Sequence, residues 1–496
     1  MVNLSSFVRF HAARTPERLA VVFKDQRISF GELLRRIEKT AGFLVSRGVK
    51  PDDVVAVVMK NSAAFLEIAF AVSHLGGVFL PINFRLAADE VGYITSNAEA
   101  KLVFADAEFA AAVEKIPSRI IVDETCQSDS TALHGDHGPA PVHVRRPEDL
   151  FRLMYTSGTT DRPKGVMHTY DNFYWKCIDH VIALGLNSVD RLLVTGPLYH
   201  VGAFDLPGVA VLWVGGMLCV HRDFDVEGVL GSIASEGLTG AWLAPVMLGS
   251  ILAHPDRGRF NVSSLRWVIG GGERTPESRI RQFSEYFSEG RYIDAYGLTE
   301  SCSGDTLMEA GREIEKIGSV GRALTHVEIE ICDAEGRRLP TGEAGEICLR
   351  GPKITQGYWR DKKKTAASFH RDWFRTGDVG YLDEDGFLYL TDRVKDMIIS
   401  GGENIASSEV ERVLYQMPEV GEAAVIGLTD EKWGERPVAV VVLNPGHSLD
   451  YDKLATHCRA HLAGFKVPKQ LILRDQLPRN PSGKVLKRLL RDELGS

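Results

Sequence analysis

The sequence lacks several features that mark other kinds of protein. It has no C-x-x-C pair, no G-x-x-x-x-G-K-[ST] phosphate loop and no excess of basic residues. Its formal net charge of −8 over 496 residues argues against a broad basic surface for gripping nucleic acid. We therefore expect no nucleic-acid partner.

Cysteine is scarce, and no export signal is evident. The seven cysteines are scattered, odd in number and without a nearby histidine at zinc-site spacing, which predicts reduced, mostly buried thiols. Arg9 and Arg14 interrupt the N-terminal region where a signal peptide would need an unbroken apolar run. These features predict a cytoplasmic location.

Long hydrophobic runs are also missing. The longest apolar stretch, LPGVAVLWVGGMLCV at 206–220, is shorter than the ~20 residues that span a bilayer and is broken by glycines. We expect it to be buried core, and we expect no integral membrane segment.

What is present is ample material for a core, with 44% hydrophobic and 25% charged residues. Residues 33–44 place apolar side chains on one helical face, and DDVVAVVMK at 52–60 reads as a buried strand. The next helix closes at Gly76 and Gly77, and the strand VFLPIN follows. The pattern predicts an α/β chain with mainly parallel sheets.

A different organisation follows in the C-terminal part. Glycine turns from about 343 to 391 separate short strands of antiparallel type. After 392 comes a compact α+β module, in which Ser408 and Glu411 are predicted to form a helix-capping box. The charged link DRVKD, with little apolar content, is expected to move.

A loop at about 125–147 is rich in Ser, Gly, Pro and His and has no period. His134, His137 and His143 would allow a metal site there. A mobile surface connection is the alternative, and the pattern favours it.

Residues 155–165, YTSGTTDRPKG, offer hydroxyl groups, backbone amides and one ammonium group, which are phosphate ligands in any fold. Four further motifs follow: IDAYGLTES at 293–301, RTGDVG at 375–380, TDRVKDMIISGGEN at 391–404 and PRNPSGKVLKR at 478–488.

In this order the motifs resemble the adenylate-forming superfamily, in its branch of acyl- and aryl-CoA synthetases. The resemblance covers nearly the whole chain. It implies an α/β fold with a large N-terminal domain (1–392) of two sheet–helix subdomains plus a distorted β-barrel. A hinge at 393–395 and a small mobile α+β C-terminal domain (396–496) would complete it.

The implied activity is an ATP-dependent ligase that forms an acyl-AMP, releases pyrophosphate and passes the acyl group to CoA, with Mg²⁺ as cofactor. The implied partners are a small-molecule carboxylic acid, ATP and CoA, for a monomer or homodimer. One alternative is an acyl-AMP ligase that loads a carrier protein, but we see no insertion between Glu300 and Asp392 that would hinder CoA. A non-catalytic nucleotide-binding regulator is the other alternative, and it would be expected to lose Lys484 or Glu300.

The resemblance assigns roles to numbered residues. Lys484 would lie between the substrate carboxylate and the α-phosphate, and Glu300, with Thr160 nearby, would hold Mg²⁺. The catalytic set is Lys484, Thr156, Lys164, Glu300 and His200. The ATP-binding set is Thr156, Ser157, Gly158, Thr159, Thr160, Lys164, Gly271, Gly272, Glu273, Ala295, Tyr296, Gly297, Thr299, Asp378, Arg393 and Lys484. The hinge residue is Lys395, and the CoA-binding set is Arg85, Gly401, Gly402, Trp433, Phe465, Lys466 and Lys469.

The acid itself is less well specified. The acyl-pocket set is His200, Gly202, Ala203, Phe204, Trp242, Gly270, Tyr296, Cys302 and Ser303. We expect the small residues Gly202 and Gly270 to leave space, and no charged residue clearly reads a second carboxylate. This favours a medium or long fatty acid, or an aryl or cinnamate-like acid, over acetate.

Asp161 departs from the family pattern, which most often has glycine at that position of the phosphate loop. Glycine suggests a loop tip with positive φ, which aspartate tolerates better than most residues. We expect the carboxylate to face solvent, so Asp161→Gly should keep activity with an equal or lower KM for ATP.

Overall fold

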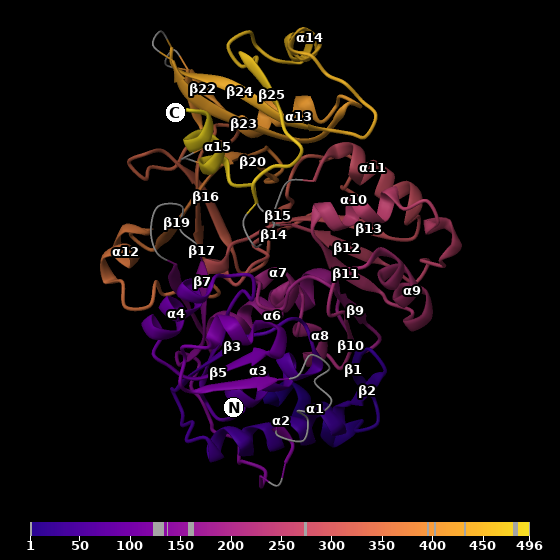
Figure 1. Cartoon of the computed structure of the whole chain (residues 1–496), viewed down its shortest axis with the longest axis vertical. Helices are drawn as coiled ribbons and strands as arrows, with labels where there is room; N and C mark the ends of the chain where they lie inside the picture. The colour runs from indigo at the N-terminus through magenta and orange to yellow at the C-terminus, as the bar shows by residue number, and fades with distance from the viewer. Residues whose placement is uncertain are drawn as a thin grey trace.

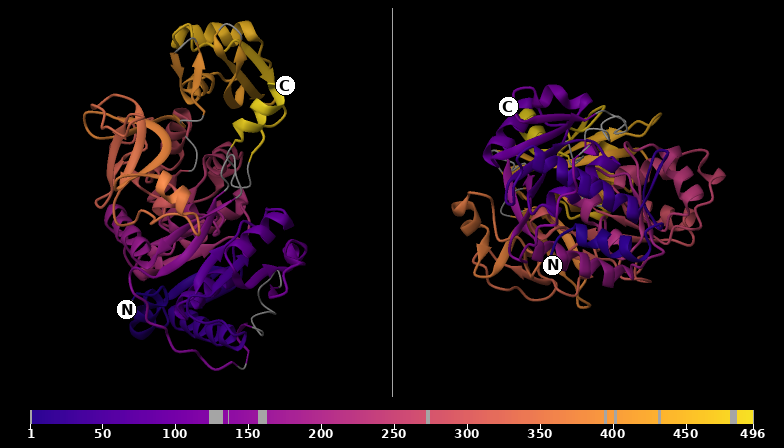
Figure 2. Two further views of the ribbon diagram at one scale, coloured as in Figure 1. Left: turned by 90° about the vertical axis from the view of Figure 1, so that its left-hand side faces the viewer. Right: turned by 90° about the horizontal axis from the view of Figure 1, so that it is seen from below.

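The computed structural model describes residues 2–122, 133–135, 137–156, 163–271, 275–393, 396–400, 403–430, 433–479 and 485–495. The chain up to Arg393 forms a large body, and the remainder forms a smaller lobe at one end of it (Figure 1). Figure 2 shows this lobe standing on the large body as a separate unit. The predicted division into a large and a small domain is thus confirmed as a fold.

The first layer of the large body is a sheet built mainly of parallel strands. Its order is β6 (Arg119–Val122), β5 (Ala100–Asp106), β3 (Val54–Val58), β4 (Val78–Pro81), β7 (Leu150–Thr156) and β8 (Lys164–Thr169). Every residue of β3 and of β4 is buried, as their continuous apolar sequences predicted. The last pair, β7 and β8, is antiparallel.

The second layer is another sheet, also parallel in its centre. Its order is β15 (Arg322–Ala323), β14 (Thr306–Leu307), β13 (Arg291–Tyr296), β12 (Trp267–Gly270), β11 (Gly240–Leu243), β9 (Arg191–Val194), β10 (Met217–Val220), β1 (Leu19–Phe23) and β2 (Gln26–Ser29). The N-terminal strand β1 pairs in parallel with β10, so the start of the chain belongs to this second sheet. The stretch 206–220 contributes β10 and buried helix, which confirms its prediction as core.

Helices cover both sheets. They are α1 (Ser5–Arg14), α2 (Phe30–Ser46), α3 (Ala63–His74), α4 (Ala88–Asn97), α6 (Tyr170–Leu184), α7 (Val201–Asp205), α8 (Ala210–Trp213), α9 (Val226–Glu236), α10 (Pro245–Ala253) and α11 (Glu277–Tyr286). Every residue of α3 is buried, including Glu67, Ser73 and His74 in its otherwise apolar sequence. Ser29 caps α2 and Ser62 caps α3, and Gly76 follows α3 with φ +72°.

The third part of the large body is an antiparallel, barrel-like sheet, as predicted for this region. It comprises β16 (Glu328–Cys332), β17 (Gly345–Arg350), β19 (Trp373–Leu382), β18 (Phe369–His370) and β20 (Leu388–Arg393), with α12 (Lys362–Ala367) beside it. Strand β20 is the last element before the small domain.

The small domain is a mixed sheet with helices packed against it. Its strands run β22 (Glu403–Ile405), β21 (Ile398–Ser400), β24 (Gly434–Leu443) and β23 (Val420–Asp430), and β25 (Gln470–Leu473) pairs with β24. Its helices are α13 (Ser407–Leu414), α14 (Tyr451–His461) and α15 (Lys487–Leu494).

The predicted capping box of α13 is wrong. Helix α13 begins after Ala406, without a side-chain cap. The Ser408 hydroxyl, already within the first turn, donates to the carbonyl of Thr391 in β20. The Glu411 carboxylate accepts from the amide of Val425 at 2.7 Å. Tertiary partners on neighbouring strands therefore take the two groups that local spacing would have paired.

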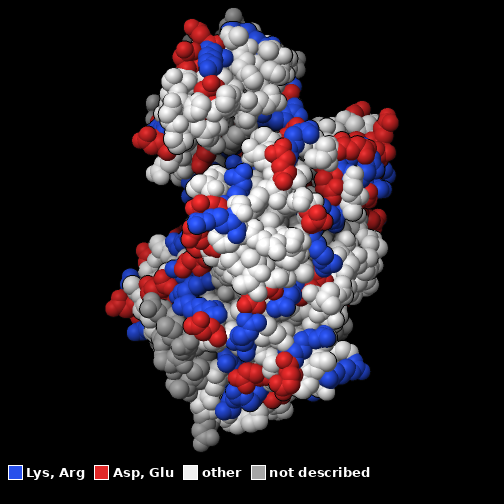
Figure 3. All heavy atoms as spheres, turned by 90° about the vertical axis from the view of Figure 1, so that its right-hand side faces the viewer, with Lys and Arg blue, Asp and Glu red and all other residues white. Residues whose placement is uncertain are grey.

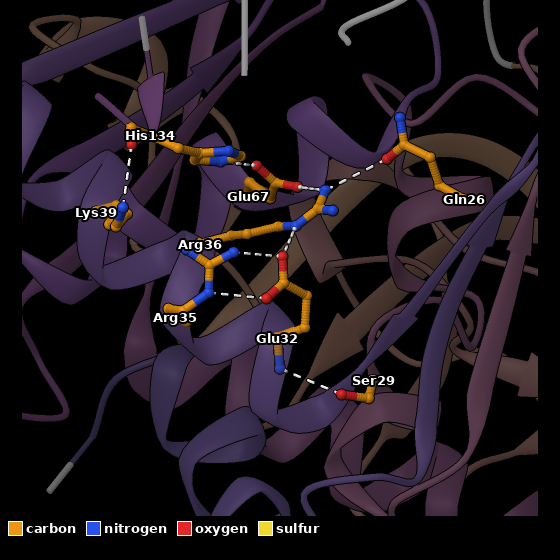
Figure 4. Close-up of polar contacts among 8 residues, drawn as sticks. All are labelled: Gln26, Ser29, Glu32, Arg35, Arg36, Lys39, Glu67 and His134. Atoms are coloured by element: carbon orange, nitrogen blue, oxygen red, sulfur yellow. Dashed lines mark hydrogen bonds and ion pairs between the residues drawn. The ribbon is translucent and has the colours of Figure 1, made fainter. Parts of the chain in front are cut away.

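His134 and His137 of the 125–147 region contact separate partners, and Figure 4 shows those of His134. His134 Nε2 lies 2.7 Å from the buried carboxylate of Glu67 in α3, and Arg36 of α2 donates to the other oxygen of that carboxylate at 3.1 Å. The His137 ring meets Phe43 edge-on at 5.4 Å. Within the described ranges no group of three His, Cys, Asp or Glu could hold a metal ion.

Other features of the described ranges bear on the composition argument. Each described cysteine is a buried free thiol, as predicted, and Cys126 lies outside the described residues. None of the described helices combines the length and the apolar character that a membrane span requires. On the face drawn in Figure 3, basic and acidic side chains are interspersed.

Candidate nucleotide and acid site

The phosphate-loop motif lies in a hairpin between β7 and β8. Thr156, the last residue of β7, pairs directly with Lys164, the first residue of β8. The ladder therefore brings together two of the predicted ATP-binding residues across the loop. Ser157, Gly158, Thr159, Thr160 and Asp161 lie outside the described residues.

Tyr296 and Asp378 meet although they come from different sheets. Tyr296 ends β13, and its hydroxyl donates to Asp378 Oδ2 at 2.9 Å. Burial, reinforced by the Asp378 carboxylate, raises the pKa of Tyr296 well above its usual value, so the phenol stays a donor. On strand β19, Asp378 is the register partner of Arg393 on β20. Three predicted ATP-site positions thus converge.

The glycine-rich segment after β12 reaches the same place. Because β12 and β13 are parallel neighbours, Gly271 follows β12 beside the end of β13. A Cβ on Gly271 would lie 3.4 Å from the carbonyl oxygen of Ala295. The predicted positions Gly272 and Glu273 lie outside the described residues.

Glu300 stands on a short 3₁₀ turn, Thr299–Ser301, directly after Gly297 and Leu298. One carboxylate oxygen accepts from the hydroxyl of Tyr358 at 2.9 Å, and the Glu300 carbonyl accepts from the amide of Thr355 at 2.7 Å. Sequence reasoning missed Tyr358, because nothing in the stretch GYWR marks a partner that lies far away along the chain.

A second group of residues that sequence reasoning missed lies beneath this turn. Arg152 of β7 is fully buried and forms a bidentate ion pair with the buried Asp205 of α7. Its Nε donates to His168 Nδ1 at 2.8 Å, and His168 Nε2 lies 2.6 Å from the carbonyl oxygen of Thr299. The available signal was Arg152 itself, a lone charge in the apolar strand LFRLM, because buried charges need partners.

The protonation of His168 follows from these contacts. Since Arg152 can only donate, Nδ1 of His168 must carry a lone pair, and the ring proton is therefore on Nε2. Burial, together with the Arg152 charge, also lowers the pKa of His168 well below its usual value. His168 is thus a neutral imidazole that donates to Thr299.

A cavity of about 390 Å³ lies between the two domains at this site. The large domain contributes Tyr296, Gly297 and Asp378 to its wall. The small domain contributes residues of α13 and β23, and also Arg479, Val485 and Lys487. Lys484 lies outside the described residues, but the described residues on both sides of 480–484 line the cavity.

On the acid side, His200 caps the short helix α7. Its Nδ1 accepts from the Gly202 amide at 3.0 Å, and its ring is stacked near the Trp242 indole at 6.5 Å between centroids. Of the other predicted pocket residues, Phe204 is buried in the core and packs against Phe79.

The expectation that Gly202 and Gly270 leave open space is wrong. A Cβ on Gly202 would lie 2.6 Å from Cζ2 of Trp242, and a Cβ on Gly270 would lie 1.6 Å from the hydroxyl oxygen of Tyr292. Both volumes are filled by aromatic side chains from elsewhere in the second sheet. At both positions, glycine makes room for a side chain of the protein, not for the substrate.

The remaining predicted pocket residues are buried. Cys302 and Ser303 continue the Glu300 turn with φ +56° and +67°, and burial raises the pKa of the Cys302 thiol to about 12. The Cys302 thiol is therefore inert at neutral pH. Ala203 is buried within α7.

The predicted CoA residues are divided between the domains. Arg85 is exposed in the large domain, whereas Trp433 and Phe465 are exposed in the small domain. Lys466 binds the Glu409 carboxylate at 2.7 Å, and Lys469 donates to the Gly464 carbonyl at 3.3 Å. A common CoA site would need the two domain surfaces to come together. Lys395, Gly401 and Gly402 lie outside the described residues.

Two family models match this arrangement. The model described as AMP-binding enzyme matches residues 8–359, and the AMP-binding enzyme C-terminal domain matches residues 409–484. The chain belongs to the AMP-binding enzyme family. The first match contains the site motifs of the large domain up to Tyr358, and the second contains α13 from Glu409 onward and Lys484.

Similar proteins agree with this family. The chain is 37% identical to a feruloyl-CoA synthase of Amycolatopsis, with 99% of each covered. It is 34% identical to a long-chain-fatty-acid–CoA ligase of Mycobacterium tuberculosis, again with 99% of each covered. Its fold matches the o-succinylbenzoate CoA synthetase of Bacillus subtilis in complex with an acyl-adenylate intermediate, with a TM-score of 0.90, 32% identity and 98% of each chain covered.

The predicted activity is confirmed at the level of the family. These relatives are named as CoA ligases or synthetases, so the chain is an AMP-forming acyl- or aryl-CoA ligase that uses ATP, Mg²⁺ and CoA. The fold of two sheet–helix subdomains, a barrel and a small C-terminal domain is confirmed as well.

Proposed function

We propose that the acid is a flat aryl acid of cinnamate type, rather than a long fatty acid. The observation that carries the proposal is the position of Trp242. Its indole lies against Gly196 and Gly202, where a Cβ would approach the ring to 2.3 Å and 2.6 Å. The wall beside His200 is therefore rigid and aromatic, which suits ring-on-ring packing better than a flexible chain. The likeness to a feruloyl-CoA synthase supports the same class of acid.

Within the shared reaction, the residue roles are proposals. Asp378 would accept from the ribose hydroxyls while Tyr296, bonded to it, borders adenine, and Lys484 would neutralise the carboxylate and α-phosphate as they approach. His200, at the start of α7, would meet the substrate carboxylate. The hinge would be 393–395, because Arg393 ends the barrel sheet and Asp396 already binds Arg491 of α15.

The residues around Glu300 fit a magnesium ion. Glu300 is half-buried, and its carboxylate, which accepts from the Tyr358 hydroxyl, carries the hard oxygen ligands that Mg²⁺ prefers. Mg²⁺ in such sites is bound by one or two carboxylates together with substrate phosphates. When bound, it would offset the negative charge of the phosphates.

A panel of acids tests the proposal. Pyrophosphate release with CoA would be measured for acetate, octanoate, palmitate, cinnamate and 4-hydroxycinnamate. We expect the highest kcat/KM on the aryl acids, and a preference for palmitate would contradict the proposal. Trp242→Ala should raise the ratio of octanoate to cinnamate activity by about tenfold. This is the value of burying two further methylenes of the octanoate chain, at ~0.8 kcal/mol each. Trp373→Ala, in the barrel against Arg350, is the matched control and should leave the ratio unchanged.

The remaining expectations concern the oligomeric state of the protein and its location in the cell. A cytoplasmic monomer or homodimer is proposed from composition and from the family, and size-exclusion chromatography with cell fractionation would test it.

A further inference from the structure

One buried side chain contacts both halves of the site. The Arg152 guanidinium binds Asp205 with two nitrogen atoms, while its Nε binds His168. All three side chains have no exposed surface. Aromatic rings surround the guanidinium, including those of Phe173 and Phe204 at 5.2 and 5.5 Å. Such a group cannot change partners without leaving buried polar atoms unpaired.

The two contacts lead to different functional segments. Asp205 is the last residue of α7, the helix whose N-terminus is capped by His200 on the acid side. His168 reaches the Thr299 carbonyl, one peptide before Glu300 on the metal side. Thr355 and Tyr358 hold Glu300 itself and Asp305 holds Ser301, and the His168 bond adds the restraint on Thr299.

We propose that Arg152 and His168 are positioning residues, which hold the Thr299–Glu300 turn in place for the metal ion and join it to the acid-binding helix α7. His168 acts only on the turn, whereas Arg152 acts on both the turn and α7. The proposal rests on the proposed metal role of Glu300. The two residues can therefore be told apart. Loss of the His168 bonds should raise the Mg²⁺ requirement, whereas a change at Arg152 should raise both the Mg²⁺ requirement and KM for the acid.

The first test compares two substitutions of His168. In His168→Gln, the amide oxygen can accept from Arg152 and the amide nitrogen can donate to Thr299, at nearly the spacing of the two imidazole nitrogens. His168→Leu can make neither bond. The readouts are equilibrium binding of ATP, by calorimetry as Mg²⁺ is varied, and the rate of acid-dependent pyrophosphate release.

For His168→Leu we expect the Mg²⁺ requirement for ATP binding to rise, and kcat for adenylate formation to fall, by roughly tenfold to hundredfold. KM for the acid should change less than about twofold. His168→Gln should recover most of both losses. If the leucine variant does not fold, His168→Asn, whose side chain is too short to make both bonds, takes its place.

The second test uses Arg152→Lys, which keeps a charge for Asp205 but has no Nε to donate to His168. It should raise both the Mg²⁺ requirement and KM for the acid. Equal damage from glutamine and leucine at His168, or a parallel rise of acid KM and Mg²⁺ requirement in His168→Leu, would overturn the proposal and leave a general folding role. Glu300→Gln tests the metal role of Glu300 separately from the positioning role of Arg152 and His168. If this variant leaves the Mg²⁺ requirement unchanged, the metal role of Glu300 fails, and the positioning proposal fails with it.

Discussion

The two walls of the interdomain cavity are built in different ways. On the large-domain side, Tyr296 donates to Asp378 in the cavity wall, and outside the lining of the cavity Arg152 and Asp205 bind each other without any exposed surface. On the small-domain side, Lys487 binds Glu411, and both side chains are 16% exposed. Bonds among elements of the large domain make the first wall a fixed template. The Lys487–Glu411 pair lies wholly within the small domain, so we expect the second wall to move as one body once the Ser408–Thr391 bond to β20 breaks.

The largest expected effect lies on the small-domain side. Lys484→Ala should lower acid-dependent adenylate formation by roughly 10²–10³, because one charge-assisted contact in the first half-reaction is lost. Supplied acyl-adenylate and CoA should still give the thioester at near the parent rate. The two half-reactions would be measured separately, by pyrophosphate release and by thioester formation.

Gly402→Leu provides the opposite variant, because it should obstruct the predicted path of pantetheine and spare adenylation. If both variants fail in the same half-reaction, the small domain does not present different residues to the site in the two steps.

An intermediate effect is expected on the large-domain side. Asp378→Asn keeps the volume and a hydrogen bond to Tyr296, but loses the ionised acceptor proposed for ribose. KM for ATP should rise roughly tenfold to hundredfold, since hydrogen bonds to charged groups contribute about 1.5–3 kcal/mol. Tyr296→Phe, which removes only the donor, should raise it less. An unchanged KM for ATP in Asp378→Asn would show that this wall does not hold the nucleotide.

The buried template should also have a pH signature. Burial and Arg152 lower the pKa of His168 in the folded state, while the unfolded chain binds a proton at its ordinary value of about 6.5. His168 therefore costs no stability above that pH, and stability is lost as the pH falls below it. His168→Gln should reduce the slope of unfolding free energy against pH by up to about 1.4 kcal/mol per unit, measured by urea unfolding between pH 7.5 and 5.5. An identical slope would mean that His168 titrates alike in both states.

The smallest effect is expected at the junction. Arg491 of α15 binds Asp396 at 2.5 Å, and the pair is partly exposed at 26% and 14%. Such pairs contribute about 0–1 kcal/mol, so Arg491→Met should shift the ratio of thioester formation to adenylation by at most about fivefold, in favour of the thioester. A shift toward adenylation would mean that the pair favours the opposite domain arrangement.

Much of the fold and part of the site could be predicted from local patterns. The buried strand β3 and the closure of α3 at Gly76 were readable because apolar continuity and glycine φ are properties of a short stretch. The convergence of Tyr296 with Asp378 was predicted only through the family resemblance. Ser408 was misread because its hydroxyl bonds to Thr391, a partner on another element that no local spacing reveals.

The sequence by itself determined the class of chemistry, since the hydroxyl- and glycine-rich loop, the acid at 300 and the lysine at 484 follow in an order that belongs to one family. The tertiary structure decided what surrounds them. It filled the space beside Gly202 with Trp242 and beside Gly270 with Tyr292, and it paired Arg152 with Asp205 and His168. The physical reason is that a residue type states which bonds or volumes are possible, whereas the partner that takes them comes from wherever close packing brings a side chain.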